Sequence, residues 1–418
     1  MKLLKLITAS IFTIAALASC DYQERVVWSP DGERMAVLAD QLHLADKESI
    51  SKPLLTKQFG SVIAVRWLPD NHHALVAYRR TLHHGLKSGA KNSKNPDTSV
   101  DYLQIFDFSG AINEVKAIAG PVLFKSNTAI EDLRLSPNGK LVAISQADKC
   151  QHRISIITLG GVASVVASNA SQPEWSKDSC SIYFFREISP KDSAYTTFIP
   201  VSTISSLAVA DASGKLSISK LRRDLAQCAG DILSGGRIRA LEDGSLLFCS
   251  TAIKLPSAGA MFGLQERALF RYRPSYRASK PSVEQIKIDG PSLASDLETF
   301  EPNQDGSKIA ICSSKGAVRL ISLSEDGNNG QVTLLEKPLA DSAGSFAGCA
   351  PRWRNANELT FSVRNASDGQ TQGGHDGDVV LQDFKGWTPG SELPARQVIS
   401  RNWPLANIDF LKLSKPHK

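Results

Sequence analysis

Alternating apolar and polar residues recur along the chain in short runs, each preceded by a polar turn. The clearest copy is "RVVWSPDGERMAVLAD" at 25–40, where a short strand ends at Trp28, a turn follows, and the alternating run "RMAVLA" comes next. Strand side chains point to alternate faces, so a period of two with apolar residues on one face predicts a half-buried strand. Each copy therefore predicts two strands joined by a tight turn.

The pattern occurs seven times, closely in the early copies and more loosely in the later ones. The copies lie at 25–40, 64–79, 132–148, 172–187, 238–252, 297–314 and 350–365. The large apolar residues that end their first strands are Trp28, Trp67, Leu135, Trp175, Leu241, Phe300 and Trp353. In the first turn, proline presets φ, Asp31 bonds its own backbone and Gly32 takes positive φ. We interpret the tryptophans as core plugs and Asp31 and Gly32 as turn formers.

The repeat unit is a small antiparallel sheet, because the first four copies are followed by a further apolar strand. Such a sheet cannot bury both faces alone, and packing face to face around an axis solves the problem. We therefore expect an all-β chain that forms a β-propeller, with seven blades of three to four antiparallel strands; six and eight blades remain open. The mature chain contains no amphipathic helix of convincing length, which disfavours α/β architectures.

Composition and charge exclude few classes of protein. The chain has 418 residues, 42% hydrophobic and 22% charged, which is ordinary for a globular protein. The formal net charge is +6, and Lys2 and Lys5 of the leader contribute two of these charges. This excess is small for the chain length and does not reach the clustered basicity of a nucleic-acid binder. We expect no nucleic-acid partner.

The first twenty residues have the pattern of an export signal. Two lysines are followed by an apolar run at 6–18, which is short of the roughly 20 residues that a membrane-spanning helix needs. We therefore assign 1–19 to a signal peptide, 20–24 to a short tether, 25–413 to the propeller and 414–418 to a tail. At about 3.6 Å per residue, the tether reaches about 18 Å.

The end of this leader, "LASC" at 17–20, resembles the lipobox of bacterial lipoproteins. The resemblance implies that Cys20 becomes the first residue, with a diacylglyceryl thioether on its sulfur and an acyl chain such as palmitate on its amine. Stable anchoring needs more than one such chain. Asp21 follows, which in enterobacterial lipoproteins implies retention at the inner membrane. That rule varies between bacterial groups, so inner and outer membrane both remain open.

The repeats resemble the Trp-Ser-Pro-Asp-Gly propellers of the TolB-like group, which also form the propeller half of prolyl oligopeptidases. The resemblance covers roughly 22–413, and it concerns fold, because propellers host binding, scaffolding and catalysis alike. A peptidase would need a G-x-S-x-G nucleophile turn on an α/β sheet, and the chain contains no such motif. We reject the peptidase interpretation. A strand at 405–413 is expected to close the ring against the first blade.

Six cysteines follow Cys20, an even number that permits disulfides in an exported protein. They are Cys150, Cys180, Cys228, Cys249, Cys312 and Cys349. Pairing of sequence neighbours is the arrangement to test first, and buried free thiols are the alternative. No pair has CxxC spacing, so a zinc or redox motif has little support.

The alternative that the chain is an enzyme rests on its histidines. Some pectin-fragment lyases that this repeat family resembles hold a metal ion with histidines from different blades. The candidates here are His83, His84, His152 and His375. Solvated loop histidines are the alternative, since neighbouring side chains on a strand point apart. The first two open a basic loop at 81–99 that could attract anionic lipid headgroups. We expect no catalytic residue, no resident metal and no cofactor.

These observations favour a lipid-anchored, extracytoplasmic propeller that binds a protein, a peptide or a polymer at the bacterial cell envelope. By resemblance to the Tol propeller, a peptide that inserts at the axial channel is one such partner. A metal-assisted polysaccharide lyase or hydrolase with its site in the funnel is the alternative. The sequence leaves the partner and the oligomeric state open.

Overall fold

The computed structural model describes the repeats and most of the strands between them. The described residues are 26–38, 42–46, 51–55, 60–82, 98–148, 151–188, 201–229, 237–254, 261–274, 281–289, 297–313, 317–337, 351–363 and 377–403. The predicted signal peptide at 1–19, the predicted tether with Cys20, the predicted closing strand at 405–413 and the predicted tail at 414–418 lie outside them.

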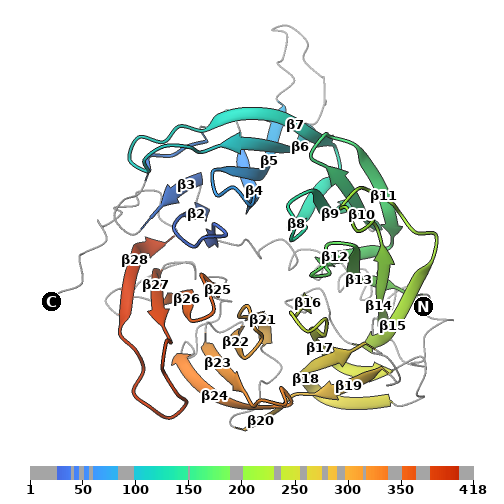
Figure 1. Cartoon of the computed structure of the whole chain (residues 1–418), viewed down its shortest axis with the longest axis vertical. Coiled ribbons are helices and arrows are strands. Elements are labelled where there is room, and N and C mark those ends of the chain that lie inside the picture. The colour runs from blue at the N-terminus through green and yellow to red at the C-terminus, as the bar shows by residue number, and fades with distance from the viewer. Residues whose placement is uncertain are drawn as a thin grey trace, which may run out of the picture.

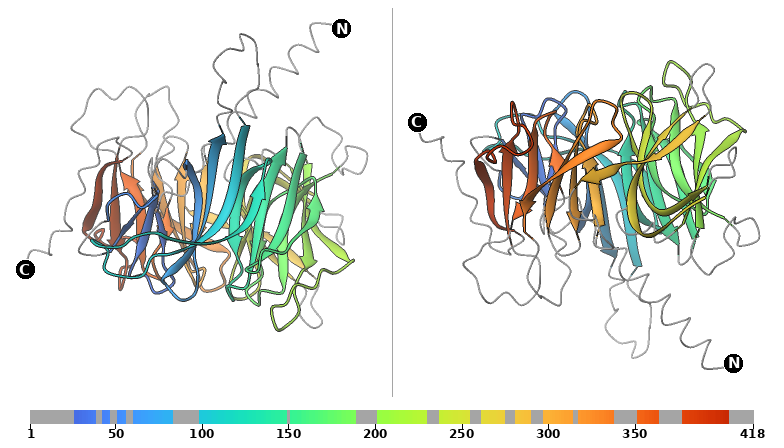
Figure 2. Two further views of the ribbon diagram at one scale, coloured as in Figure 1. Left: turned by 90° about the horizontal axis from the view of Figure 1, so that it is seen from above. Right: turned by 90° about the horizontal axis from the view of Figure 1, so that it is seen from below.

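The described chain is a seven-bladed β-propeller without helices, which confirms the predicted fold class. Figure 1 shows the sheets arranged in sequence order around a central axis. Figure 2 shows from two sides that the molecule is a thick disc, with strands that run between its two faces. In each blade the first strand lies nearest the axis, and successive strands lie farther out.

The first four blades have simple antiparallel order. Blade 1 consists of β1 (Val26–Trp28), β2 (Met35–Leu38) and β3 (Leu42–Ala45). Blade 2 consists of β4 (Ser61–Trp67), β5 (His73–Leu82), β6 (Thr98–Asp107) and β7 (Ile118–Ser126). Blade 3 consists of β8 (Ala129–Leu135), β9 (Leu141–Asp148), β10 (Gln151–Thr158) and β11 (Ala163–Ser168). Blade 4 consists of β12 (Ala170–Trp175), β13 (Ser181–Glu187), β14 (Val201–Ala208) and β15 (Arg222–Ala229).

Among the last three blades, blades 5 and 6 have additional strand pairings, whereas blade 7 is a separate four-stranded sheet. Blade 5 consists of β16 (Arg239–Ala240), β17 (Leu246–Lys254), β18 (Met261–Arg273) and β19 (Ser282–Gln285). Blade 6 consists of β21 (Leu297–Pro302), β22 (Lys308–Ser313), β23 (Val318–Leu323) and β24 (Asn329–Glu336), with β20 (Lys287–Asp289) added in parallel to β24. Blade 7 consists of β25 (Arg352–Trp353), β26 (Glu358–Val363), β27 (Gly377–Asp383) and β28 (Arg396–Trp403). In addition, β15 pairs with β17, so blades 4 and 5 form one continuous sheet.

The second strand of each repeat is buried on both faces, where the sequence pattern predicted one. On β2 the side chains of Met35 and Val37 belong to the core shared with blade 7, and those of Ala36 and Leu38 to the core shared with blade 2. The strand β9 divides in the same way between blades 2 and 4. The reason is that a blade lies between two neighbours, so both faces of its middle strands are covered.

Seven hydrophobic clusters fill the seven spaces between neighbouring blades. Blades 1–2, 2–3, 3–4, 4–5, 5–6, 6–7 and 7–1 each share one cluster. Phe248 and Phe270 stack at 6.0 Å in the 4–5 cluster, and Trp67 meets Phe108 edge to face at 6.0 Å in the 1–2 cluster. The clusters form a closed sequence, so blade number and ring closure follow from the core itself.

The turns that join first and second strands lie on one face of the disc and form what we call the turn ring. Its seven turns span 29–34, 68–73, 136–141, 176–181, 241–245, 303–308 and 354–358. In each turn the first residue's amide donates to the last residue's carbonyl, as Ser29 does to Arg34 at 2.8 Å. The structure corrects the predicted alignment of two repeats. The last residue of the first strand, which is the tryptophan position, is Ala240 in one repeat and Pro302 in the other, in place of the predicted Leu241 and Phe300.

Neighbouring turns contact each other around the ring. The Asp31 amide donates to Asn71 Oδ1 at 3.1 Å, the Asn138 amide to Ser179 Oγ at 3.0 Å, and Asn303 Nδ2 to the Ala356 carbonyl at 3.0 Å. An ion pair of 3.2 Å between Lys177 and Glu242 joins turns 4 and 5. Pro69 lies against Gly139, and Leu241 lies against Gly306.

The fourth residue of six turns adopts positive φ. These residues are Gly32, Asn71, Gly139, Ser179, Gly244 and Gly306, with φ between 63° and 77°. Glycine adopts this conformation without steric cost, whereas Asn71 and Ser179 do so while their side chains accept the bonds from the neighbouring turns.

Three tryptophans connect blades through their indole nitrogens. Trp67 donates to the Val27 carbonyl at 2.9 Å, Trp175 to the Arg134 carbonyl at 3.1 Å and Trp353 to the Glu301 carbonyl at 2.9 Å. Each acceptor is the next-to-last residue of the preceding blade's first strand. The indoles therefore hold neighbouring first strands at one height along the axis.

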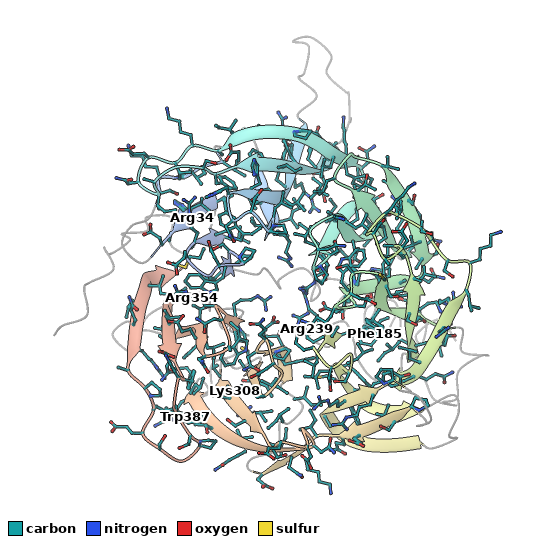
Figure 3. The ribbon with its side chains drawn as sticks, viewed as in Figure 1. Arg34, Phe185, Arg239, Lys308, Arg354 and Trp387 are labelled. Atoms are coloured by element: carbon teal, nitrogen blue, oxygen red, sulfur yellow. The ribbon has the colours of Figure 1, made fainter. Side chains whose placement is uncertain are left out.

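The ring closes between blades 7 and 1 through a relay and an arginine. Trp28 donates to Thr360 Oγ1 at 3.3 Å, and that hydroxyl donates to the Arg352 carbonyl at 2.8 Å, the position that other indoles reach directly. Arg354, labelled in Figure 3, donates to the Gly32 carbonyl and lies 5.1 Å from the centre of the Trp28 ring. Closure thus rests on packing, one buried arginine and a hydroxyl relay.

Among the described residues, no helix has the length and apolar character required to cross a membrane.

Replacement of Gly139 by alanine is expected to lower the stability of the protein more than replacement of Gly244. Both glycines have positive φ, 72° and 77°, which costs a residue with a Cβ about 1–2 kcal/mol. A Cβ on Gly139 would also lie 2.5 Å from the Pro69 ring, whereas nothing lies within 4 Å of that position on Gly244. Thermal unfolding of both variants measures the difference, and equal losses would contradict a packed turn ring.

Replacement of Arg354 by methionine is expected to destabilise the fold by about 2–4 kcal/mol. The variant loses a charge-assisted bond to the Gly32 carbonyl and the cation–π contact with Trp28. Denaturant unfolding provides the measurement, with Arg396→Met as control, because Arg396 joins blades 6 and 7 with a side chain 33% exposed against 5% for Arg354. A larger loss in the control would show that closure does not depend on Arg354.

Candidate functional site: a charged cluster at the propeller axis

Charged side chains occupy one position of the first strand in six of the seven blades. The position is the next-to-last residue of that strand, and one further residue separates it from the turn ring. Its seven residues are Val27, Arg66, Arg134, Glu174, Arg239, Glu301 and Arg352. Since the first strand lies nearest the axis, these residues converge there, and Figure 3 shows Arg239 at the inner end of its blade. Asp132 contacts Arg66 and Arg134 of this set, and Arg237 contacts Asp132. We call the six charged residues of the set, together with Asp132 and Arg237, the axial cluster.

One centre of the axial cluster is built around Glu301. Its Oε2 accepts bonds from Arg239 Nε at 2.9 Å, from Arg239 Nη2 at 2.6 Å and from Arg352 Nη1 at 2.8 Å. Arg239 also lies 3.8 Å from Glu174. Two guanidinium groups and two carboxylates therefore balance in this Glu301 centre, which joins blades 4, 5, 6 and 7.

The second centre is built around Asp132. Three arginines from three blades surround this carboxylate: Arg66 at 3.9 Å, Arg134 at 3.4 Å and Arg237 at 3.4 Å. These distances exceed the 2.7–2.9 Å typical of charge-assisted bonds. In the Asp132 centre three arginine side chains thus lie around one carboxylate, and these side chains are 8–15% exposed.

The two centres interact across the axis. Burial opposes the ionisation of Glu301, but the guanidinium groups of Arg239 and Arg352, with that of Arg134 from the Asp132 centre, hold the pKa of Glu301 below its ordinary value. The residues that define the axial cluster are five arginines and three carboxylates.

Irregular strand pairing positions the Asp132 centre. The register of β8 shifts between Ile130 and Asp132, which is a β-bulge at Glu131. Ile130 and Leu133 both belong to the apolar core between blades 2 and 3, although strict alternation would place them on opposite faces. The bulge therefore lets the core keep both residues while Asp132 and Arg134 point away from it.

Three arginines also bond their own strands. Arg66, Arg239 and Arg352 each donate through Nη1 to the carbonyl of the residue before them, at 2.7, 3.4 and 3.2 Å. First strands have no neighbouring strand on their axial side. These bonds satisfy carbonyl groups on an otherwise open sheet edge, so the arginines have a structural role as well.

The predicted metal-ligand candidates do not meet at the axis within the described structure. His152 lies on β10, with its Nδ1 atom 3.1 Å from Glu131 Oε2, and this hydrogen bond raises the pKa of His152. The described residues contain no group of three or more metal-ligating side chains. His83, His84 and His375 lie outside the described residues.

The cysteines depart from the predicted pairing. Cys180 and Cys228 carry free thiols, so pairing of sequence neighbours is wrong for both. Cys228 belongs to the apolar core between blades 4 and 5, where burial raises the pKa of its thiol. Cys249 is buried in the 5–6 core, and Cys312 is disulfide-bonded. Cys150 and Cys349 lie outside the described residues.

The axial cluster was not predicted from the sequence, although its signal is present there. A charged residue precedes three of the four aligned tryptophans, in "VRW" at 65–67, "PEW" at 173–175 and "PRW" at 351–353. The degenerate copies repeat this in "LRL" at 133–135, "IRA" at 238–240 and "FEP" at 300–302. A charge between apolar neighbours near the end of a buried strand, repeated at one position, indicates a shared axial site.

Comparison with known proteins supports the fold and leaves the function open. No family model matches the chain, and no curated protein matches it either. Solved structures do match. Prolyl oligopeptidase B from Galerina marginata aligns at a TM-score of 0.50 and 10% identity, over 96% of this chain and 53% of the oligopeptidase.

Two further similar structures are the tricorn protease and TolB. The tricorn protease has a TM-score of 0.48 and 12% identity, over 88% of this chain and 33% of the protease. TolB from Acinetobacter baumannii has a TM-score of 0.41 and 15% identity, over 86% of this chain and 76% of TolB. The chain therefore spans about a third of the tricorn protease and half of the oligopeptidase. At such identities the likeness concerns the propeller fold alone.

Replacement of Glu301 by glutamine is expected to lower thermal stability at neutral pH and to remove part of its acid dependence. Because the pKa of Glu301 is lowered in the folded state, its stabilisation is present above the ordinary glutamate pKa of about 4.3 and is lost as pH falls through the folded value. The difference in melting temperature between native protein and variant should therefore shrink below about pH 4. Glu336→Gln, which affects a surface pair with Arg396, is the control; a pH-independent difference for Glu301→Gln would contradict the assignment.

Proposed function

We propose that the chain is a lipid-anchored propeller of the bacterial cell envelope that binds a protein or polymer partner. The observation that carries the proposal is the axial cluster, where six blades contribute charged side chains to one place. A fold built from apolar interfaces gains little stability from buried charges, because their desolvation offsets their attraction. Convergent polar groups in a ring of strands are instead the usual feature of a recognition site.

The geometry of the first blade supports an orientation for the anchored protein. Strand β1 begins at Val26, six residues after Cys20, and ends at the turn ring. A lipid on Cys20 would therefore hold the molecule near the membrane by the face opposite the turn ring. The turn ring would then point away from the bilayer.

The position of the axial cluster agrees with this orientation. Six of its residues directly precede the last residue of a first strand, and all of those strands end at the turn ring. The cluster thus lies near the turn-ring end of the axis. A partner in the periplasm or in the cell wall would approach it from the side away from the lipid.

The envelope location is proposed from the leader, and the TolB-like character from the repeat motif. TolB structures are among those similar to the chain, which is consistent with a binding module of this kind. The tether implied by the leader is too short to let the propeller move far from the bilayer.

Replacement of Cys20 by serine is expected to release the protein from membranes without loss of its fold. The variant has no sulfur to receive the diacylglyceryl group, so the hydrophobic anchor is absent. Fractionation of cells and incorporation of labelled palmitate measure the effect. The matched control is Cys180→Ser, which removes a free thiol in the turn ring and should leave the protein in the membrane fraction. Sedimentation of Cys20→Ser with lipid would refute the anchor.

Partner binding is tested by crosslinking in intact envelopes. The native protein should recover one dominant envelope component, and Cys20→Ser, which is displaced from the membrane, should recover less of it. A component recovered equally with an unrelated lipid-anchored protein would contradict the proposal.

A further inference from the structure

The outer strand of each blade leaves one edge of its sheet at the rim, the outer circumference of the disc. An unprotected edge can pair with another strand, and natural proteins protect it with charged residues, proline or a covering segment. In blade 1 the Ser51 and Leu54 amides donate to the Leu44 and Leu42 carbonyls of β3, at 2.8 and 2.9 Å. In blade 6, β20 pairs with β24. The outer strands β7, β15, β19 and β28 each contain a charged residue.

The outer strand of blade 3 has none of these protections within the described structure. Strand β11, with the sequence ASVVAS, contains neither a charged residue nor a proline. It pairs with β10 alone, so its outer edge has no neighbouring strand there. The chain contains no charged residue at all from 154 to 173. Figure 1 shows β11 at the rim of the disc.

Exposed apolar side chains gather beside this edge. Val165 on β11 and Val162 in the turn before it are 59% and 60% exposed, and Ile118 on β7 is 62% exposed. The two strands are neighbours, because a Cβ placed on Gly161 would lie 3.3 Å from the Leu123 carbonyl oxygen of β7. Exposed apolar residues gathered in one region indicate an interaction surface.

We infer that β11 pairs antiparallel with β11 of a second copy of this chain, so that two propellers form a two-fold dimer through their third blades. The dimer goes beyond the proposed function, because it needs neither an envelope partner nor the axial cluster.

Charge favours a second copy as the occupant of this edge. In a two-fold dimer the same patch meets itself, so a charged residue on the edge would lie close to its own copy. Like charges across a pair of strands are destabilising. The uncharged stretch 154–173 removes this repulsion, whereas the arginines of β15 and β28 would produce it.

The regular part of β11 sets the register of the new pair. The pairing of β11 with β10 shifts at Val166, which forms a bulge. A bulge interrupts pairing, so the new pair uses the residues before it. A two-fold axis at Ser164 places Val165 opposite Ala163 of the second copy, and the two Val165 side chains become diagonal neighbours.

Sheet twist gives the two copies a common orientation. Neighbouring strands rotate by roughly 20–25°, so the three steps from β8 to β11 amount to about 60–75°. Figure 2 shows outer strands inclined to the axis. The two-fold axis of an antiparallel pair is perpendicular to the sheet, and at the rim that direction lies within about 15–30° of the propeller axis. Both turn rings then face the same side, which, if the proposed function holds, lets both lipids reach one bilayer.

Crosslinking in intact membranes tests the contact. A cysteine is placed at Val165 of the full chain in a Cys180→Ser background, which removes a free thiol. A short bismaleimide should join Val165→Cys into a product of twice the monomer mass. The matched control is Leu221→Cys, which replaces a residue 66% exposed on blade 4 and should give no more product than Cys180→Ser alone.

Sedimentation of the purified full chain in detergent measures the affinity. The native chain should sediment as a dimer, and Val165→Lys should raise the dissociation constant at least about tenfold, because it brings two like charges together across the pair. Leu221→Lys makes the same change away from β11 and should leave the constant unchanged. Melting temperatures of both variants show whether the propeller is intact, and the crosslink provides a measurement that needs no charged variant.

Several results would overturn the dimer. A monomeric native chain without a Val165→Cys product would show that the edge stays unpaired. Equal products from Val165→Cys and Leu221→Cys would show random collision, and an unchanged dissociation constant in Val165→Lys would place the contact elsewhere. A Val165→Cys product with a different protein would assign the edge to an extended strand of that protein.

The dimer and the proposed function can fail separately. If Val165→Cys crosslinks to a second copy but no envelope component is recovered, the dimer stands and the binding-module function fails. If an envelope component is recovered while the native chain is monomeric, the function stands and the dimer fails.

Discussion

The structure depends on one constraint: a blade buries neither of its faces by itself. Alternate residues of β2 enter two different cores, and β9, β17 and β22 divide in the same way. Every blade therefore needs a neighbour on each side, and only a closed ring provides both for all seven. The seven apolar clusters fill every space between neighbouring blades and so reflect that closure. Burial of this apolar area is the main favourable contribution to folding.

Polar contacts then set how the blades are aligned. The indoles of Trp67, Trp175 and Trp353 reach carbonyl groups at one position of the preceding blade. The turns that follow contact each other around the ring. Because apolar packing is not directional, these bonds supply the alignment along the axis. They bring the same position of each first strand to the same height.

This alignment makes the axial cluster possible. When equivalent positions converge, a charge placed there in one repeat meets charges from the others. Arg239 pairs with Glu301 and Arg352 does the same, whereas three arginines share Asp132. The ring thus holds charged groups close together at its centre while its stability comes from the apolar cores farther out.

The sequence by itself determined the repeat, its strands and turns, and the all-β ring, because alternation and turn residues such as Asp31 and Gly32 are local signals. It also contained the charged residue before Trp67, Trp175 and Trp353. Only the tertiary structure decided that β15 joins β17 and that Ala240 and Pro302 take the tryptophan position in the degenerate copies. It alone placed Arg66, Arg134 and Arg237 around Asp132. Those relations connect residues up to 171 positions apart, and a period of two residues carries no information about which blade lies opposite another across the axis.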